Sequence, residues 1–165
     1  MTQTIQSKSI QALFFWADNN KLPEELFPRD EGRLLALVKL NLNSRNLSSI
    51  PSEISLLDNL EELYLSYNNL TYLPKEIGEL DNLKVLWVMG NKLKSLPNEI
   101  KKLTLLEDLV AFNNKINHIS LDILDMPNLK SLFLHDNCLD IGMLENGFIS
   151  KLEQINSSIY NQTPQ

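Results

Sequence analysis

Apolar residues recur along this chain with a period of 23 residues, and the period runs without an insertion from Leu37. The second repeat reads LEELYLSYNNLTYLPKEIGELDN, and the third reads LKVLWVMGNKLKSLPNEIKKLTL. A fixed period of roughly 20 to 50 residues is typical of a solenoid, in which each repeat buries its apolar side against its neighbours. Taking the first leucine of each block as position one, the five repeats begin at Leu37, Leu60, Leu83, Leu106 and Leu129.

Positions four and six of every repeat are apolar, and polar or aromatic residues stand around them. This alternation with a period of two predicts a short β-strand. Because each repeat completes one coil, successive strands run in the same direction, and the sequence predicts a five-stranded parallel sheet on the concave side. The inward pairs are Leu40/Leu42, Leu63/Leu65, Leu86/Val88, Leu109/Ala111 and Leu132/Leu134.

The return segment of the repeat follows the pattern LPxxIxxL, as in 51–54, 74–77 and 97–100. Proline suits the first turn of a helix, and a glutamate near the N-terminus favours the helix dipole. We therefore predict short helical turns on the convex side. Their buried residues are Ile54, Ile77, Ile100 and Ile123.

Both ends of a solenoid need a cover, because the terminal repeats otherwise expose their leucines. Residues 4–19 form an amphipathic pattern, with Ile5, Ala12, Leu13, Trp16 and Ala17 near one face. We predict one domain over 1–165, made of a helical N-terminal cap (1–36) and five repeats (37–151), the last of which merges into the C-terminal cap. Helical spacing from Phe148 predicts a capping helix over 147–160, followed by a tail over 161–165.

Position nine carries asparagine in four repeats, namely Asn68, Asn91, Asn114 and Asn137. An amide both donates and accepts hydrogen bonds, so it suits backbone groups left unpaired where each strand turns. We interpret these residues as a structural ladder. In the first repeat Arg45 takes this position, and that turn needs solvent or a different cap.

The whole pattern, LxxLxLxxNxLxxLPxxIxxLxx, resembles the leucine-rich repeat family in its 23-residue form. That form occurs in small bacterial repeat proteins and in intracellular scaffolds. The resemblance implies an α/β fold: a right-handed curved solenoid with a parallel sheet inside, short helical or irregular segments outside, and a helical cap at each end. It also implies a non-enzymatic protein-interaction module.

Composition narrows the classes of partner and compartment. A net charge of −6 and a pI near 4.9 argue against nucleic acid and against anionic membrane surfaces. The single Cys138 cannot form an internal disulfide, which fits a reducing, cytoplasmic setting, with export as an effector left open. We expect a protein or peptide partner and no cofactor or metal.

The variable strand positions carry the functional signal. Adjacent strands lie about 4.8 Å apart, so their outward side chains form one contiguous field. Apolar fields of this kind mark binding sites, and tryptophan and tyrosine are favoured at the centres of interfaces. The apolar and aromatic candidates, with one histidine, are Tyr64, Trp87, Val110 and Phe133 at position five, Met89, Phe112 and His135 at position seven, Tyr67 at position eight and Val85 at position three.

Two sets of charges border this field. Glu61, Lys84, Glu107 and Lys130 alternate in sign at position two, and we interpret them as pairs that stabilise the sheet. Glu62 and Asp108 flank Val85 at position three. Their row has one cation, Lys39 at the edge, so these two carboxylates are candidates for orienting a basic partner.

No catalytic arrangement is evident in the sequence. His118 falls in a loop, where we expect a solvated imidazole, and neither histidine has metal-ligand spacing with Cys138. An acid–base pair of His135 with Asp136 is disfavoured, because neighbouring strand residues point to opposite faces. We expect Cys138 to be a partly buried, inert thiol.

Three readings of the concave field remain: partner binding, self-association as a homodimer, and simple stabilisation of the sheet. We favour docking of a protein or peptide. The alternatives for the whole protein are a secreted bacterial effector, a substrate-recognition arm of a larger enzyme system, and a homodimeric structural protein.

Overall fold

The computed structural model describes residues 2–140, with side chains from residue 9 onward. Two α-helices come first, α1 (Thr2–Asn19) and α2 (Glu31–Leu35). The predicted capping helix over 147–160 and the tail over 161–165 lie outside the described residues. The strands are β1 (Lys39–Asn41), β2 (Glu62–Tyr64), β3 (Val85–Trp87), β4 (Asp108–Val110) and β5 (Ser131–Phe133). The 3-10 helices are η1 (Ser52–Leu56), η2 (Lys75–Glu79), η3 (Asn98–Lys102) and η4 (Leu121–Asp125).

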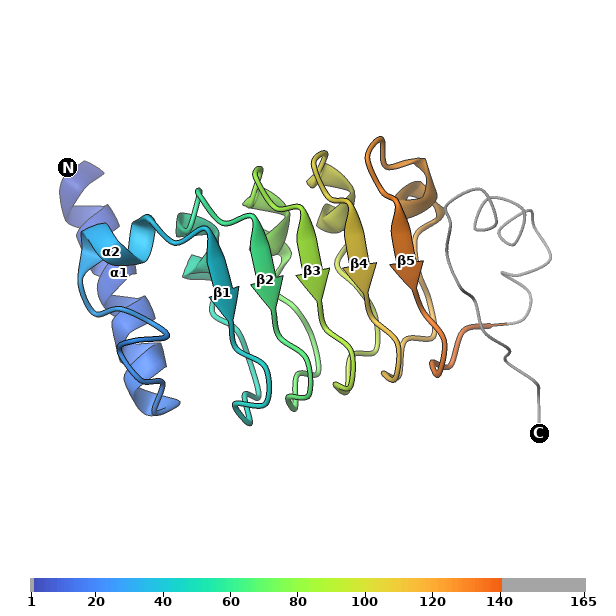
Figure 1. Ribbon diagram of the computed structural model, residues 1–165, viewed down its shortest axis with the longest axis horizontal. Helices are drawn as coiled ribbons and strands as arrows, with labels where there is room; N and C mark the ends of the chain where they lie inside the picture. The colour runs from blue at the N-terminus through green and yellow to red at the C-terminus, as the bar shows by residue number, and fades with distance from the viewer. Residues whose placement is uncertain (1, 141–165) are drawn as a thin grey trace.

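The five strands form one parallel sheet in sequence order, as predicted. Figure 1 shows them side by side, with the 3-10 helices behind them and α1 at the N-terminal end. Each strand pairs residue for residue with the next at a spacing of one repeat, so Leu40 lies opposite Leu63 and Leu63 opposite Leu86. Side chains at one repeat position therefore line up in a row across the sheet.

Backbone hydrogen bonds continue past the three-residue strands to position eight. Tyr67 N donates to the Met89 carbonyl at 2.9 Å, and Gly90 N donates to the Phe112 carbonyl at 3.1 Å. The chain then turns sharply, because the residue at position eight has a positive φ in every repeat. These residues are Ser44, Tyr67, Gly90, Asn113 and Asp136, with φ between 53° and 66°.

The convex side is built from 3-10 turns that begin after Pro51, Pro74 and Pro97, each held in extended conformation. In the fourth repeat, where proline is absent, the Ser120 hydroxyl accepts a hydrogen bond from Asp122 N. The four predicted isoleucines are all buried beneath these turns. Close stacking depends on Gly78, since a Cβ there would lie 2.4 Å from the Glu99 carbonyl oxygen.

Helix α1 packs onto η1 of the first repeat. Leu13 and Ala17 of α1 are buried, as predicted, and so is Ile10, which the sequence interpretation did not include. The Trp16 indole N–H donates to the Ser49 carbonyl at 3.2 Å, tying α1 to the repeats. The core then runs continuously from α1 to Leu134, because every inward strand pair is buried.

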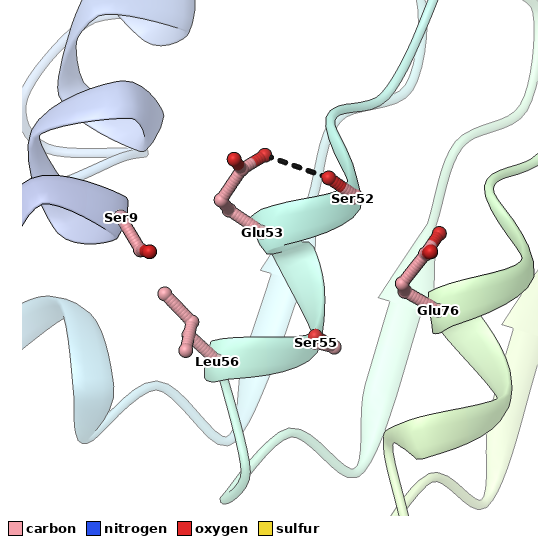
Figure 2. Close-up of a pocket in the computed structure, with 6 residues that line it drawn as sticks. All are labelled: Ser9, Ser52, Glu53, Ser55, Leu56 and Glu76. Atoms are coloured by element: carbon pink, nitrogen blue, oxygen red, sulfur yellow. Dashed lines mark hydrogen bonds between the residues drawn. The ribbon is translucent and has the colours of Figure 1, made fainter. Parts of the chain in front are cut away.

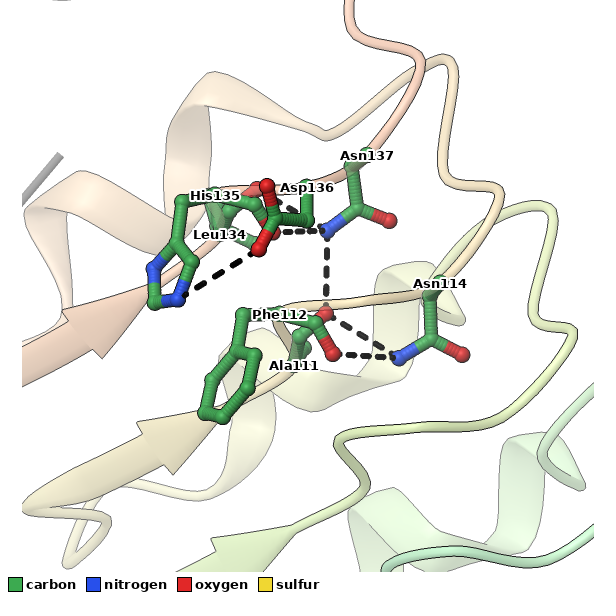
Figure 3. A network of polar contacts seen from close by, with 7 residues as sticks. All are labelled: Ala111, Phe112, Asn114, Leu134, His135, Asp136 and Asn137. Atoms are coloured by element: carbon green, nitrogen blue, oxygen red, sulfur yellow. Dashed lines mark hydrogen bonds and ion pairs between the residues drawn. The ribbon is translucent and has the colours of Figure 1, made fainter. Parts of the chain in front are cut away.

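The asparagine ladder connects neighbouring repeats. Asn91 Nδ2 donates to the carbonyls of Leu65, Val88 and Met89, and its Oδ1 accepts from Leu70 N. At the end of the ladder, Figure 3 shows Asn114 and Asn137 both donating to the Ala111 carbonyl, at 3.1 and 3.0 Å. Each amide thus satisfies backbone groups of its own repeat and of the preceding one.

The first repeat has no such amide of its own. Arg45 is exposed, and its backbone N–H donates to Asn68 Oδ1 at 3.0 Å, which also accepts from Leu47 N. The second repeat therefore supplies the acceptor for this turn, while the guanidinium stays in solvent.

Candidate functional site

The position-five residues form one row across the concave face, the outward side of the sheet. The register places Trp87 between Tyr64 and Val110, and Val110 between Trp87 and Phe133. Tyr64 and Trp87 contact edge to face, with ring centroids 4.9 Å apart and planes at 88°. This geometry is favoured by the aromatic quadrupole, and it holds both rings in place. Tyr64, Trp87 and Phe133 are all half-buried.

Val110 departs from the predicted exposed row. Its exposed fraction is 8%, so it offers little surface of its own. In the sheet register, the short valine side chain stands between two large aromatics, Trp87 and Phe133, on the neighbouring strands. Val110 therefore forms the low point of the row between Trp87 and Phe133.

A second row lies at position seven, where Met89, Phe112 and His135 are half-buried. The rings of Phe112 and His135 stack, with centroids 4.3 Å apart and planes at 12°. Val85 at position three is also half-buried, so apolar surface extends over three rows. The register brings together the predicted apolar candidates on β2 to β5.

His135 and Asp136 lie closer than the strand pattern allowed. His135 Nε2 is 3.9 Å from Asp136 Oδ2, a contact drawn in Figure 3. The prediction that the two side chains point to opposite faces was wrong, because β5 ends at Phe133 and Asp136 adopts a φ of 54°. Among the described residues, no third polar side chain bonds His135 Nδ1, so the pair lacks the orienting group that acid–base catalysis needs.

Unsatisfied polar atoms concentrate on this face. Among the described residues, three buried side-chain atoms lack a hydrogen-bond partner: Ser66 Oγ, Trp87 Nε1 and His135 Nδ1. All three belong to positions five and seven. Unpaired buried polar groups are uncommon and destabilising in a folded protein, and they gather where function constrains the side chains.

Glu62 is already neutralised within the chain. Its Oε2 lies 2.7 Å from Lys39 Nζ and accepts a hydrogen bond of 2.8 Å from the Tyr64 hydroxyl. The bond from Lys39, and then that from Tyr64, lower the pKa of the Glu62 carboxyl. Burial, followed by the bond to Glu62, raises the pKa of the Tyr64 hydroxyl. Lys39 Nζ also lies 4.9 Å from the centroid of the Tyr64 ring.

Asp108 differs from Glu62. It is half-buried, and within the described part of the chain its carboxylate makes no ion pair or hydrogen bond. The position-two charges pair with one another as predicted, with Lys84–Glu61 at 2.8 Å and Lys130–Glu107 at 2.7 Å. Of the two carboxylates that the sequence suggested for orienting a partner, Asp108 alone keeps an unpaired charge.

Tyr67 sits at the end of the sheet, not on a strand. It is 54% exposed and has a φ of 57°, a conformation that is rare for a bulky residue. Its ring lies over Gly90, where a Cβ would come within 2.6 Å of Tyr67 Cδ1. The sequence identified Tyr67 as a candidate, but not the backbone strain that accompanies it.

A separate polar pocket of about 260 Å³ lies on the convex side, between α1, η1 and η2. Figure 2 shows the residues that line it, namely Ser9 of α1, then Ser52, Glu53, Ser55 and Leu56 of η1, and Glu76 of η2. Ser52 Oγ donates to Glu53 Oε2 at 3.0 Å. The residues that line this pocket include no histidine and no cysteine.

The remaining reactive side chains are scattered. His118 is exposed, in agreement with the solvated imidazole expected. Cys138 is also exposed, so the expectation of a partly buried thiol was wrong; it lies in the turn after Asn137, outside the sheet.

Among residues 2–140, no group of three acidic, histidine or cysteine side chains could hold a metal ion. Within the same residues, no helix has both the length and the apolar character to cross a bilayer.

Comparison with known proteins agrees with the repeat pattern. A family model described as a leucine-rich repeat region matches residues 19–159. A leucine-rich repeat protein of Leptospira interrogans has a similar structure, with a TM-score of 0.66 and 30% identity over 81% of this chain and 38% of its own. Internalin C2 of Listeria monocytogenes is similar with a TM-score of 0.59 and 31% identity, over 68% of this chain and 49% of its own.

This chain spans less than half the length of either of those solved chains. No curated protein is significantly similar to it in sequence. The family match covers most of the chain, and the parallel sheet, the 3-10 turns and the asparagine ladder all follow the 23-residue repeat. The chain belongs to the leucine-rich repeat family, whose domains generally serve as non-enzymatic scaffolds for binding proteins.

Proposed function

We propose that this protein binds a protein or peptide through its concave face. The observation that carries the proposal is the row of half-buried aromatics on β2, β3 and β5, interrupted on β4 by the buried Val110 and bordered by the position-seven side chains Met89, Phe112 and His135. Large aromatic side chains supply much of the binding energy at protein interfaces, and tryptophan and tyrosine are the favoured ones. Trp87 and Phe133 are the proposed anchors.

Pre-formed packing supports this role. Trp87 is held by Tyr64, and Phe112 is held by His135. Side chains that are already ordered lose less conformational entropy when a partner covers them, so more of the contact energy appears as affinity. The unsatisfied Trp87 and His135 nitrogens are compatible with a surface maintained for contact at some cost in stability.

The test is capture of partners from native lysate by the whole chain. We expect the double variant Trp87→Ala and Phe133→Ala to lose capture while its circular dichroism stays that of the wild type. A matched control is Tyr72→Ala with Leu121→Ala, since these side chains are exposed but lie off the strands. Retained capture by the folded concave variant would overturn the proposal.

Two alternatives use the same repeats differently. Self-association through the concave face predicts a mass in sedimentation that rises with concentration and falls in the Trp87→Ala, Phe133→Ala variant. A role as the recognition arm of a larger protein draws support from the greater length of the two similar bacterial chains, and an exported bacterial effector is a further form of this alternative. A parent reading frame with a catalytic domain would favour that alternative.

A further inference from the structure

The β1–β2 edge of the concave face contains a complete site for a cationic side chain. The Lys39 ammonium bonds the Glu62 carboxylate at 2.7 Å and lies 4.9 Å from the centre of the Tyr64 ring. The carboxylate comes from position three, and the aromatic ring comes from position five of the same repeat. A cation between a carboxylate and a ring gains both an ion pair and a cation–π contact.

Strand β4 has a carboxylate at the same repeat position, but no cation is paired with it. Asp108 occupies the position of Glu62, and in the sheet register its neighbours are Val85 and Ser131. Neither of them carries a charge. The next row on the same face places Trp87 and Phe133 on either side of Val110. Trp87 and Phe133 therefore lie diagonally from Asp108 on the neighbouring strands, whereas Tyr64 is on the same strand as Glu62 and its equivalent on β4 is Val110.

When a partner covers this face, it is energetically unfavourable to leave the Asp108 carboxylate without a cation. Of the charged residues on the strands, Lys39 and Glu62 neutralise each other, which leaves Asp108. Asp108 is already half-buried, so a partner seated on Trp87 and Phe133 removes much of its remaining water. Burying an unpaired carboxylate is strongly unfavourable, whereas a hydrogen-bonded cation offsets that loss. An apolar or acidic segment is therefore a poor occupant.

We propose that the partner places a lysine or arginine side chain on Asp108, in the manner of Lys39 on Glu62. The aliphatic stem would cross the low point at Val110, between Trp87 and Phe133, and the charged head would reach the carboxylate. Long cationic side chains combine an apolar stem with a polar end in this way, and arginine also stacks on aromatic rings. This inference rests on the proposed use of the concave face and specifies the chemistry of the ligand.

Defined small probes test the site directly. The ¹⁵N-labelled chain is titrated with Nα-acetyl-arginine amide and Nα-acetyl-lysine amide, and with Nα-acetyl-norleucine amide as the uncharged control. We expect saturable shifts at the Asp108 and Val110 amides and at the Trp87 indole N–H with at least one cationic probe. Asp108→Asn should weaken this binding about fivefold or more. Asp81→Asn, which removes the same charge from an exposed loop, should leave the affinity unchanged.

The inference is overturned if neither cationic probe gives saturable shifts at these groups. It is also overturned if Asp108→Asn binds them as well as Asp81→Asn does, or if the norleucine probe binds equally. These results leave the proposed function standing, because capture by the wild type and loss of capture in the Trp87→Ala, Phe133→Ala variant are measured separately. Conversely, retained capture in that variant removes the proposed function, whatever the probes show.

Discussion

The Tyr67 ring lies over the backbone of Gly90, the equivalent residue of the next repeat, so closely that a Cβ on Gly90 would be 2.6 Å from Tyr67 Cδ1. Both residues have a positive φ, 57° and 66°. Glycine accepts this conformation without steric cost, whereas tyrosine does not. The third repeat thus provides the space that the exposed tyrosine of the second repeat occupies.

Gly90→Ala should lower the free energy of unfolding by about 1–3 kcal/mol, through the strained φ and the contact with the ring. The measurement is urea denaturation of the whole chain. Gly32→Ala is the matched control, because Gly32 lies in α2 and a Cβ there would meet only Asp30 Oδ1, at 3.5 Å. Equal midpoints for the two variants would contradict the prediction.

Tyr67→Asn should raise the free energy of unfolding by about 0.5–1 kcal/mol, because asparagine tolerates the left-handed conformation better than tyrosine. Asn113 already occupies this position in the fourth repeat, with a φ of 53°. If Tyr67 belongs to the binding surface, the same variant should bind its partner less tightly. A decrease in the urea midpoint would mean instead that ring packing on Gly90 outweighs the backbone strain.

Asn91→Ala should destabilise the protein by about 2–4 kcal/mol, since it leaves Leu70 N and buried strand-end carbonyls without their partner. Thermal and urea unfolding both report this loss. Asn69→Ala provides a contrast, because the Asn69 side chain bonds Asn46 at the surface. That change should stay within about 0.5 kcal/mol of the wild type. Similar losses for both asparagines would argue against the ladder.

The carboxyl of Glu62 should titrate below the usual glutamate value of about 4.3, because Lys39 and Tyr64 stabilise its charged form. A lowered pKa in the folded state means that this group stabilises the fold above its unfolded pKa. The contribution disappears as the pH falls through the folded pKa. The midpoint is read from the side-chain carboxyl ¹³C shift.

Lys39→Met should move that midpoint upward, and Tyr64→Phe should do so by a smaller amount, following the order of the two hydrogen bonds. Glu107 serves as the internal reference, because its partner is Lys130 and neither substitution touches that pair. If neither substitution changes the titration midpoint of Glu62, the two hydrogen bonds are not maintained in solution.

The repeat pattern alone predicted much of the architecture. A period of 23 residues, with fixed inward positions, determines strand direction, register and the buried isoleucines, because each repeat must bury the same side chains against its neighbours. It also placed Trp87 beside Tyr64, since the register follows directly from the period. The role of the asparagines followed from their position where each strand ends.

Only the tertiary structure showed which of the predicted binding residues are buried, exposed or paired. Sequence could not show that Val110 is buried, because burial depends on how the surrounding side chains pack. Nor could alternation place Asp136 or Cys138, since both follow the strand, where positive φ values end the two-residue period. The pairing of Glu62 and the unpaired charge of Asp108 likewise depend on which side chain reaches which carboxylate. The sequence thus determined the scaffold and its variable positions, whereas three-dimensional packing decided which of them remain available for contact.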